Sequence, residues 1–448
     1  MVLNNLFGTD GIRGKVGEFP IIYSFTIKLG ISLAILLQRR LLLGALAIGM
    51  DTRTSSKSLA KFLALGANTA GLDVYFCGVV PSMAVAIIAK NNNDISVGCM
   101  VSASHNQFCD NGFKFFDSNG IKFSKDMEFE FTKIVSSIDD DLIKYSVAGI
   151  YCGSKFVSLY YNFIDSLAAS IIKNPKLKIV FDCANGSLSF CTYSLFLNKI
   201  FDLVCINNLP NGCNINLDCG SEFPLSLSQK VVEHCADLGF AFDGDGDRLV
   251  VCDEFGKVID FNYVMALLIL FNKEKYSDNN GFVSTNMVNN ALLLFAKKND
   301  IPFFLSDVGD SNVSSLMHKK KCRLGGESSG HFIFNEFCIA SDSLVSAIKI
   351  IEALQFFNLQ PSEMQKFFTL NPQKIYNYYY SNYAAISGLL ESNIFKEFVG
   401  NMLDTKIFIR FSGTEKCLRI VVSAMDIDDV DSALKDIINF IDSNFEYS

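Results

Sequence analysis

The stretch LGFAFDGDGDR, residues 238–248, places three aspartates directly behind a short apolar run. The apolar run reads as a buried strand, and Asp243, Asp245 and Asp247 follow it at alternate positions. Their carboxylates can converge only if the backbone curls tightly, which the intervening glycines allow because they lack a Cβ atom. Converging carboxylates repel one another unless a cation lies among them, and hard oxygen ligands suit Mg²⁺. The stretch therefore predicts a strand that carries a magnesium-binding loop.

Two other interpretations of this loop are weaker. A solvated acidic turn would not need a glycine at both intervening positions. A calcium-binding EF-hand loop is suggested by Glu254, which falls at the twelfth position, but that loop needs a glycine at the sixth position, where this chain has Arg248. The flanking residues also read as strands rather than helices, so we expect a magnesium site.

Short apolar runs alternate with helix-length segments along the chain, which favours an α/β architecture. The predicted strands are 45–50, 73–77, 95–101, 178–182, 203–206, 238–242, 281–285 and 303–306, and the predicted helices include 21–38, 56–70, 225–237, 263–270 and 289–297. We expect Ser55 to cap the second of these helices. The end of the chain differs, because 406–410 and 418–422 predict a strand pair that is followed by a helix over 428–441.

The chain has 448 residues, a length typical of about three domains. The alternation described above predicts three similar α/β units and one distinct C-terminal α+β unit. We expect these domains to cover residues 1–150, 151–254, 255–368 and 369–448.

Composition excludes several classes of protein. Half of the residues are hydrophobic, which argues against disorder, and the net charge of −8 disfavours nucleic acid or an anionic membrane as a partner. An anionic substrate would therefore need a local basic pocket. The longest apolar region, 29–50, is interrupted by Arg39 and Arg40, so no membrane span is expected. The cysteines are scattered through apolar strands, which is typical of reduced, buried thiols in a cytoplasmic protein.

The sequence VSASHN, residues 101–106, follows a predicted buried strand, where α/β proteins build their sites. A serine beside a histidine suggests a hydrolase. However, the G-x-S-x-G motif is absent, and neighbours on an extended chain point opposite ways, so we disfavour a Ser–His acyl-transfer pair. The alternative is a serine that carries a phosphoryl group. Lys114, in a turn just downstream, could neutralise a phosphoryl group, although taken alone it could equally be a surface lysine.

Two further loops are rich in groups that bind polar ligands. The loop GGESSGH at 325–331 combines donors and acceptors that suit sugar hydroxyls. The loop RFSGTE at 410–415 combines a guanidinium, two hydroxyls and backbone N–H groups around a glycine, which together can cradle phosphate. Arg419 follows on the return strand, and Arg13 lies in an N-terminal glycine-rich loop.

Together, and in this order, the loops resemble those of the α-D-phosphohexomutase superfamily, and within it the bacterial phosphoglucosamine mutases most closely. The matching stretches are FGTDGIRG at 7–14, MDTR at 50–53, SASHN at 102–106, DCANG at 182–186, DGDGDR at 243–248, GESSGH at 326–331 and SGTE at 412–415. The resemblance covers essentially the whole chain. It implies three related α/β domains and a C-terminal phosphate-binding domain around a central cleft, in agreement with the organisation above.

The resemblance also implies a role for each site residue. Ser104 would be the phosphoserine, and its phosphate oxygen would complete a site for one Mg²⁺ with the three aspartates. The other implied assignments are Arg13, Lys114 and Arg248 for steadying the phosphoryl group, His105 for carrying a proton, Glu327, Ser329 and His331 for binding the sugar, and Arg410, Ser412, Gly413, Thr414 and Arg419 for holding the non-reacting phosphate.

The implied reaction converts glucosamine 6-phosphate to glucosamine 1-phosphate. Phosphorylated Ser104 would donate to O1, and the resulting glucosamine 1,6-bisphosphate would turn over and return its 6-phosphoryl group to Ser104. Such chemistry needs positioning and charge neutralisation, which Mg²⁺ and three cations supply. The resemblance implies a cytoplasmic enzyme, a monomer or a homodimer, that feeds UDP-N-acetylglucosamine and cell-wall synthesis.

Two rival functions stay open. A mannose or glucose phosphomutase would share the chemistry, although the FGTDGIRG opening and Ser328 favour glucosamine. A catalytically silent sugar-phosphate-binding protein is suggested by departures from the family's motifs, but it would have no reason to keep Ser104 with all three aspartates. The departures are Gln107 in place of proline, Ser311 and Asn312 where an arginine is normal, ASDS at 340–343 in place of a Gly-Asp-Gly-like turn, and Phe411 and Lys416 in place of lysine and proline.

Overall fold

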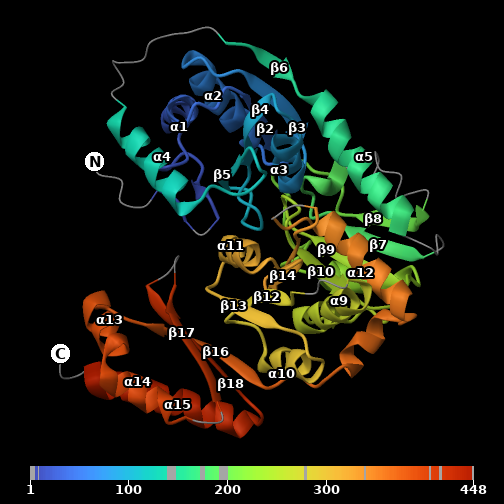
Figure 1. Cartoon of the computed structure of the whole chain (residues 1–448), viewed down its shortest axis with the longest axis vertical. Coiled ribbons are helices and arrows are strands. Elements are labelled where there is room, and N and C mark those ends of the chain that lie inside the picture. Colours follow the sequence, from blue (N-terminus) through green and yellow to red (C-terminus); the bar gives the residue numbers. More distant parts are fainter. Residues whose placement is uncertain are drawn as a thin grey trace.

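The structure, a computed structural model, describes residues 6–8, 10–138, 148–171, 177–190, 200–276, 280–337, 340–402, 405–412 and 416–445. Its strands form four separate sheets, which follow one another along the chain (Figure 1). The first three sheets are flanked by helices on both faces and the fourth by helices on one side, so the fold is α/β with a distinct C-terminal α+β unit, as predicted.

The first domain holds the loop at residues 101–106 that carries Ser104, which is called the serine loop below. Its strands are β1 (Ile12–Lys15), β2 (Ala45–Met50), β3 (Val74–Val79), β4 (Ile95–Val101), β5 (Asp110–Asp117) and β6 (Ile150–Cys152), and its helices are α1 (Tyr23–Arg39), α2 (Ser56–Thr69), α3 (Ser82–Asn91) and α4 (Lys125–Ser137). The strand order is β1-β5-β4-β2-β3-β6. Because successive side chains of a strand point to opposite faces, the strands pack against α1, α2 and α4 on one face and against α3 on the other.

The second domain holds the loop at residues 243–248, which is called the aspartate loop below. Its elements are α5 (Ser154–Ile171), β7 (Lys178–Asp182), β8 (Asp202–Ile206), α8 (Leu225–Glu233), β9 (Leu238–Phe242), β10 (Leu249–Cys252) and β11 (Val258–Ile259). The sheet order is β11-β10-β9-β7-β8, with β7 parallel to both β8 and β9. The aspartate loop joins β9 to the antiparallel β10, so it lies at the C-terminal edge of the parallel strands, where α/β proteins place their sites.

The third domain holds the loop at residues 325–331, which is called the sugar loop below. Its elements are α9 (Phe261–Lys275), β12 (Phe282–Thr285), α10 (Asn290–Lys298), β13 (Phe303–Ser306), α11 (Asp310–Lys320), β14 (Leu324–Glu327), β15 (His331–Phe334), α12 (Ser343–Phe357) and a 3₁₀ helix, Pro361–Lys366. The sheet order is β13-β12-β14-β15. The sugar loop is the tight turn between β14 and β15, which pair with Glu327 opposite His331.

One apolar core runs through these three domains. It includes Met100 from the first domain, Phe240 from the second and Phe332 from the third, and α5 packs against both α3 and α12. The three reactive loops are therefore carried by a single packed body rather than by three independent ones.

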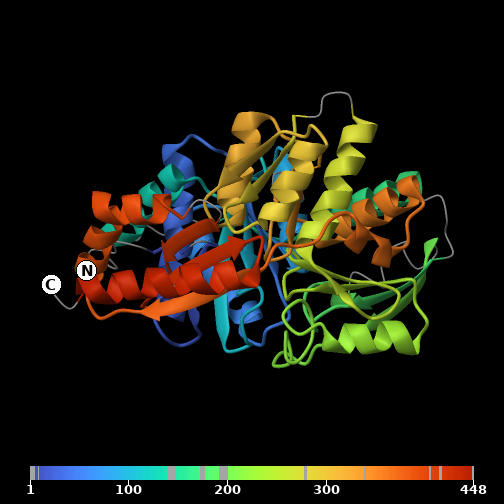
Figure 2. The same cartoon turned by 90° about the horizontal axis from the view of Figure 1, so that it is seen from below.

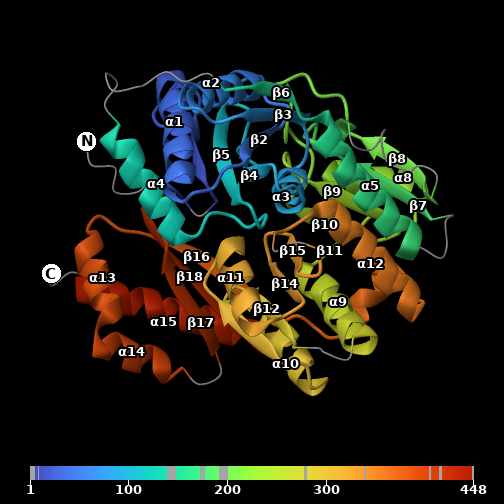
Figure 3. The ribbon, with the colours of Figure 1, turned by 45° about the horizontal axis from the view of Figure 1, so that its top comes forward.

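The fourth domain has its own core. It comprises β16 (Gln373–Tyr379), α13 (Tyr383–Glu391), α14 (Asn393–Gly400), β17 (Thr405–Phe411), β18 (Cys417–Ala424) and α15 (Ile427–Phe445), with the sheet order β16-β18-β17. Its buried residues pack among themselves, with Leu418 and Ile420 of β18 against Ile437 of α15. Figures 1, 2 and 3 show it beside the third domain, at the opposite side of the molecule from the second.

Most predicted elements are present, and the strands 45–50, 95–101, 178–182, 238–242 and 303–306 have the predicted bounds. The predicted cap at Ser55 is wrong: its side chain makes no capping bond, and its hydroxyl accepts from Asn111 instead. β16 went unpredicted, because its mostly exposed, tyrosine-rich sequence lacks the alternation of a half-buried strand. β6 and β11 lie at or just beyond the residues expected to end the first two domains.

None of the helices in the described part of the chain is long and apolar enough to span a bilayer. The cysteines that the structure describes form no disulfide with one another, and Cys99, Cys183 and Cys252 are buried, as predicted.

Candidate active site

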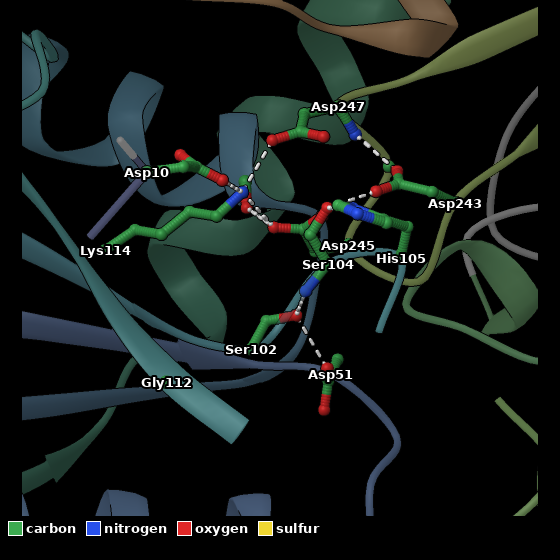
Figure 4. Close-up of polar contacts among 12 residues, drawn as sticks. Asp10, Asp51, Ser102, Ser104, His105, Gly112, Lys114, Asp243, Asp245 and Asp247 are labelled. Atoms are coloured by element: carbon green, nitrogen blue, oxygen red, sulfur yellow. Dashed lines mark hydrogen bonds and ion pairs between the residues drawn. The ribbon is translucent and has the colours of Figure 1, made fainter. Parts of the chain in front are cut away.

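Ser104 lies in the loop that follows β4, with its hydroxyl turned toward the aspartate loop. The hydroxyl donates to Asp243 Oδ2 at 2.6 Å, and its Oγ lies 3.2 Å from Nδ1 of His105 (Figure 4). The backbone φ of Ser104 is 52°, in the left-handed region. The sequence predicted that the side chains of Ser104 and His105 point apart, as neighbours do on an extended chain. That prediction is wrong, because the backbone at Ser104 is not extended.

Two glycines shape the aspartate loop for different reasons. Gly246 has a φ of 73°, which supplies the predicted curl. Gly244 instead permits a close approach, since a Cβ atom there would lie 2.7 Å from the carbonyl oxygen of Ser104. The backbone N–H groups of Asp247 and Arg248 both donate to Asp243 Oδ1 at 3.1 Å, which closes the turn. The curl therefore brings the first aspartate directly against the serine.

The three aspartates form the donor set that a divalent cation needs. Asp243, Asp245 and Asp247 are buried, and one oxygen of each lies within 4.8 Å of the others. Among the described residues, Oδ1 of Asp245 and Oδ1 of Asp247 are buried without a hydrogen-bond partner. Burial, and then the two neighbouring carboxylates, raises the pKa of Asp243 well above its ordinary value. A cation among these oxygens would remove that penalty, so the residues fit Mg²⁺.

Lys114 is buried on β5 and pairs with three carboxylates. Its Nζ lies 2.6 Å from Asp247, 2.8 Å from Asp245 and 2.9 Å from Asp10 (Figure 4). Burial alone would lower the pKa of Lys114, but these carboxylates raise it well above its ordinary value, so the ammonium is charged. The interpretation of a surface lysine is therefore wrong.

The other two predicted cations lie on either side of this cluster. Arg13, on β1, pairs with Asp10, and Arg248 donates to Glu222 Oε1 at 2.9 Å. The Nε atoms of both arginines are buried without a partner among the described residues, so each can still donate to a ligand. Burial, followed by the charges of Arg248 and Arg13, lowers the pKa of His105 to about 3, which leaves its imidazole neutral.

The sugar loop touches the aspartate loop. Ser329 Oγ lies 2.9 Å from Nδ1 of His331, and Nε2 of His331 lies 3.4 Å from Asp247 Oδ1, an ion-pair distance rather than an aligned hydrogen bond. Burial raises the pKa of Glu327, while the nearby charges of His331 and Arg248 act against that rise. The three predicted sugar-binding residues therefore lie at the edge of the metal site.

The predicted phosphate cradle lies on the fourth domain. Arg410 on β17 and Arg419 on β18 are direct cross-strand partners, an arrangement that is repulsive unless an anion lies between them. Burial and then Arg419 lower the pKa of Arg410, whereas Glu327 of the sugar loop raises it. Nε of Arg410 is buried without a partner among the described residues. Ser412 follows β17, whereas Gly413 and Thr414 lie outside the described residues.

Sequence reasoning assigned no role to several residues that complete the site. Asp10 pairs with Lys114, and Lys122 on the first domain bridges Asp10 at 2.5 Å and Asp310 of the third domain at 2.6 Å. Ser82 donates to Asp245 Oδ2 at 2.5 Å. Asp10 lay within a quoted motif, so it could have been assigned. Asp310 adjoins the motif position where an arginine is normal, so it too could have been assigned. Lys122 and Ser82 lie outside the quoted motifs, and only the fold brings them to the site.

The structure also shows how three departures from the family's motifs are accommodated. The hydroxyls of Ser341 and Ser343 donate to the carbonyl oxygens of Asp247 at 2.6 Å and Gly246 at 2.7 Å, so the altered turn holds the aspartate loop. Lys122 supplies a cation beside Asp310, near the position of the missing arginine. Phe411, where the family has lysine, packs its ring against those of Tyr380 and Tyr383, at centroid distances of 5.7 and 4.6 Å. Nothing in the structure explains Lys416.

Comparisons with known proteins agree on one family. Domains I, II and III of the phosphoglucomutase/phosphomannomutase family, each described as alpha/beta/alpha, match residues 4–141, 158–256 and 260–369. A phosphoglucosamine mutase from Bartonella bacilliformis is 34% identical, over 97% of this chain and 98% of its own length.

Solved structures show the same fold. A phosphoglucomutase/phosphomannomutase family protein from Burkholderia thailandensis superposes with a TM-score of 0.81 at 21% identity, over 99% of this chain and 98% of its own. The N-acetylphosphoglucosamine mutase of Aspergillus fumigatus, solved with GlcNAc-6P and magnesium, superposes with a TM-score of 0.69 at 15% identity, over 98% and 96% of the two chains. With a serine facing three aspartates and relatives that match along its whole length, this chain belongs to the phosphoglucomutase/phosphomannomutase family of the α-D-phosphohexomutase superfamily.

Proposed function

We propose that this chain interconverts glucosamine 6-phosphate and glucosamine 1-phosphate through phosphorylated Ser104 and a glucosamine 1,6-bisphosphate intermediate. The observation that carries the proposal is the 2.6 Å contact of Ser104 with Asp243 inside a buried triad of aspartates. The names of its relatives, phosphoglucosamine mutases at about a third identity over the whole chain, support glucosamine over the mannose and glucose alternatives.

Asp243, Asp245 and Asp247 would hold one Mg²⁺, with a phosphate oxygen on Ser104 as a further ligand. When bound, the ion would withdraw charge from the phosphoryl oxygens as the group moves. Oδ1 of Asp245 and Oδ1 of Asp247, which are buried without a hydrogen-bond partner among the described residues, support this assignment. The relative that was solved with magnesium and GlcNAc-6P belongs to the same fold.

In the first half-reaction, the O1 hydroxyl of the sugar attacks the phosphorus on Ser104, the Oγ–P bond breaks and an O1–P bond forms. Lys114, Arg13 and Arg248 surround the position of the phosphoryl group and offset its charge. Neutral His105 lies next to Oγ, so it can pass a proton between the sugar hydroxyl and the departing serine oxygen.

In the second half-reaction, the bisphosphate presents its 6-phosphoryl group to Ser104, which takes it and regenerates the phosphoserine. One phosphate faces Ser104 at a time, so the other must lie in the cradle of Arg410, Arg419 and Ser412. The bare repulsion of the two arginines supports this role, because a phosphate between them would relieve it. The resemblance assigns the same role to Gly413 and Thr414, which lie outside the described residues.

Glu327, Ser329 and His331 would bind the sugar between these two phosphate positions. The charge of Glu327 raises the pKa of Arg410, and the charge of His331 opposes the rise in the pKa of Glu327, so this carboxylate lies within electrostatic reach of both the cradle and the sugar loop. Its negative charge suits the 2-ammonium group of glucosamine, which glucose and mannose lack.

A coupled assay with the 6-phosphates of glucosamine, glucose and mannose tests the proposal. We expect the highest kcat/KM with glucosamine 6-phosphate, dependence on Mg²⁺, and an added phosphate on the Ser104 peptide in active protein. A higher kcat/KM with mannose or glucose 6-phosphate would instead assign the same chemistry to another sugar. No turnover with any of the three would favour a silent binding protein.

A further inference from the structure

The side chain of Arg53 is fully buried beside the loop that carries Ser104. Its Nη2 donates to the carbonyl oxygens of Ser104 at 2.9 Å and of Asn106 at 2.8 Å. Its Nη1 donates to the carbonyl oxygen of Asp110 at 3.1 Å and to that of Gln107. One planar guanidinium therefore donates to four carbonyl oxygens of the turn at 104–110, which a lysine with a single nitrogen could not do.

Asp51 holds the same serine from its other side. Its Oδ2 accepts from Nε of Arg53 at 2.8 Å and from the hydroxyl of Ser102 at 2.6 Å. The oxygen of Ser102 in turn accepts from the backbone N–H of Ser104 at 2.9 Å (Figure 4). The ion pair thus fixes both peptide groups of Ser104, the N–H through Ser102 and the carbonyl through Arg53.

Ser104 needs such support because of its backbone conformation. A φ of 52° is uncommon for a residue with a Cβ atom and persists only where the surroundings hold it. This conformation turns Oγ toward Asp243. Asn216 of the second domain adds a bond of 2.8 Å to the carbonyl oxygen of Ser104, so the turn is held from two domains.

Stability alone is a poor explanation of a buried ion pair. The cost of removing Arg53 and Asp51 from water offsets most of their attraction, and apolar residues of similar volume often serve a fold as well. What apolar residues could not do is satisfy the carbonyl groups of the serine turn, and those groups belong to the reactive loop.

We propose that Arg53, anchored by Asp51, is a positioning residue for phosphoryl transfer. It holds Ser104 in the left-handed conformation, so that Oγ keeps one direction while it gives up a phosphoryl group to one end of the sugar and receives one from the other end. The proposal rests on the proposed function, because it assumes that Ser104 carries the phosphoryl group. A displacement of about 1 Å in a reacting atom can cost on the order of 10²-fold in rate.

The test compares Arg53→Lys with Arg40→Lys in the full chain. Arg40 is a matched control, because it also binds a carboxylate with two nitrogens but lies at the surface, against Glu130. Phosphorylation of Ser104 by glucose 1,6-bisphosphate is followed by intact mass, together with kcat, KM, Mg²⁺ affinity by calorimetry and the melting temperature.

For Arg53→Lys we expect the labelling rate and kcat to fall about 10²-fold, with KM within about threefold and Mg²⁺ affinity unchanged. Arg40→Lys should match wild type in labelling rate, kcat, KM, Mg²⁺ affinity and melting temperature. Wild-type labelling in Arg53→Lys overturns the proposal, and so does a parallel loss of labelling, Mg²⁺ affinity and melting temperature, which indicates a purely structural role.

Ser102→Ala carries the test if Arg53→Lys does not fold, because it removes the hydroxyl that links Asp51 to the Ser104 N–H and leaves Arg53 in place. We expect a labelling rate about tenfold below wild type, and an unchanged rate overturns the proposal. A wild-type protein that neither turns over nor takes label refutes the proposed function, and the positioning role falls with it. A labelled wild type with an equally labelled Arg53→Lys refutes the positioning role alone.

Discussion

The serine–aspartate site and the phosphate cradle are built in opposite ways. The first lies in an apolar core that three domains share, and hydrogen bonds cross its domain boundaries, such as that from Ser82 to Asp245. The cradle lies on a domain with a core of its own. That domain contacts the third through a few hydrogen bonds: Asn289 and Asn371 exchange two, and Lys406 donates to the carbonyl oxygen of Val288 at 2.7 Å.

This difference agrees with the separate requirements of the two regions in a mutase reaction. The reacting atoms must keep one geometry through both half-reactions, which a shared core provides. The cradle must release and rebind a sugar that has turned around, a task that suits a domain with its own core. The predictions below probe the two regions in turn.

The largest effect is expected in the serine–aspartate site, from Ser104→Ala. Removing the group that carries the phosphoryl should lower kcat at least about 10³-fold, because no other side chain can take its place in the cycle. Activity in the coupled assay and peptide mapping of phosphate check this. Ser102→Thr, which keeps the neighbouring hydroxyl, serves as the control. Full activity in Ser104→Ala, with no phosphate found on the variant's serine loop, would refute the covalent mechanism.

Asp245→Asn should lower kcat by about 10²–10³-fold and weaken Mg²⁺ binding, since it removes one ligand charge beside the phosphoserine. Calorimetric titration with Mg²⁺ separates the two effects. Asp237→Asn in the same domain is the control, because Asp237 caps the backbone of Lys178 away from the site. Normal activity of Asp245→Asn in the presence of a chelator would mean that the aspartates are structural.

In the phosphate cradle, Arg410→Ala should raise KM about 10- to 100-fold in both directions, the loss of about 1.5–3 kcal/mol for a charge-assisted contact. It should also weaken the thermal stabilisation given by inorganic phosphate, because Arg419 is left alone in the cradle. Initial rates in both directions and melting curves with phosphate check this. An effect confined to one direction would remove Arg410 from the shared cradle.

Glu327→Gln should reduce the preference for glucosamine over glucose 6-phosphate by roughly 10-fold, because it removes the charge that would face the 2-ammonium group. Ratios of kcat/KM for the two sugars measure it. Glu274→Gln, at an exposed site of the third domain, should leave the ratio as it is. An unchanged ratio in Glu327→Gln places the ammonium elsewhere.

The smallest effect concerns stability within the shared core. Burial raises the pKa of Asp342 from 3.8 to about 6, although bonds from Val345, Tyr160 and Leu344 oppose the rise. The folded state therefore binds more protons than the unfolded state between about pH 4 and 6, so this carboxyl contributes its stability at low pH and loses it as pH rises through 6.

Asp342→Asn should accordingly match wild type near pH 4 and exceed it at pH 8 by up to about 3 kcal/mol, since one pKa unit corresponds to about 1.4 kcal/mol. Denaturant midpoints at the two pH values measure it. Asparagine caps a helix as well as aspartate does, so α12 keeps its start. Asp260→Asn, at the exposed cap of α9, is the control. A difference that is constant with pH would show that the carboxyl of Asp342 is not perturbed.

Local patterns predicted well wherever a single signal dominates. The strand before the aspartate loop is a continuous run without polar side chains, bounded by Asp237 and Asp243, and its bounds are those predicted. β5 was read only as a turn and a lysine, because its buried charged residue broke the apolar pattern. The partners of that lysine, Asp10 and the aspartates, come from two other segments, and no local pattern encodes their distance.

By itself, the sequence determined the chemistry: a serine after a buried strand, three aspartates spaced by glycines, and loops of arginine, hydroxyl and carboxylate groups. These follow from residue type and spacing, which act over a few residues. Only the tertiary structure decided which groups meet. Ser104 reaches Asp243 across 139 positions of sequence, and Arg53 reaches the serine turn across 51. Such contacts depend on how apolar faces of separate sheets pack into one core, and packing is a property of the folded chain as a whole.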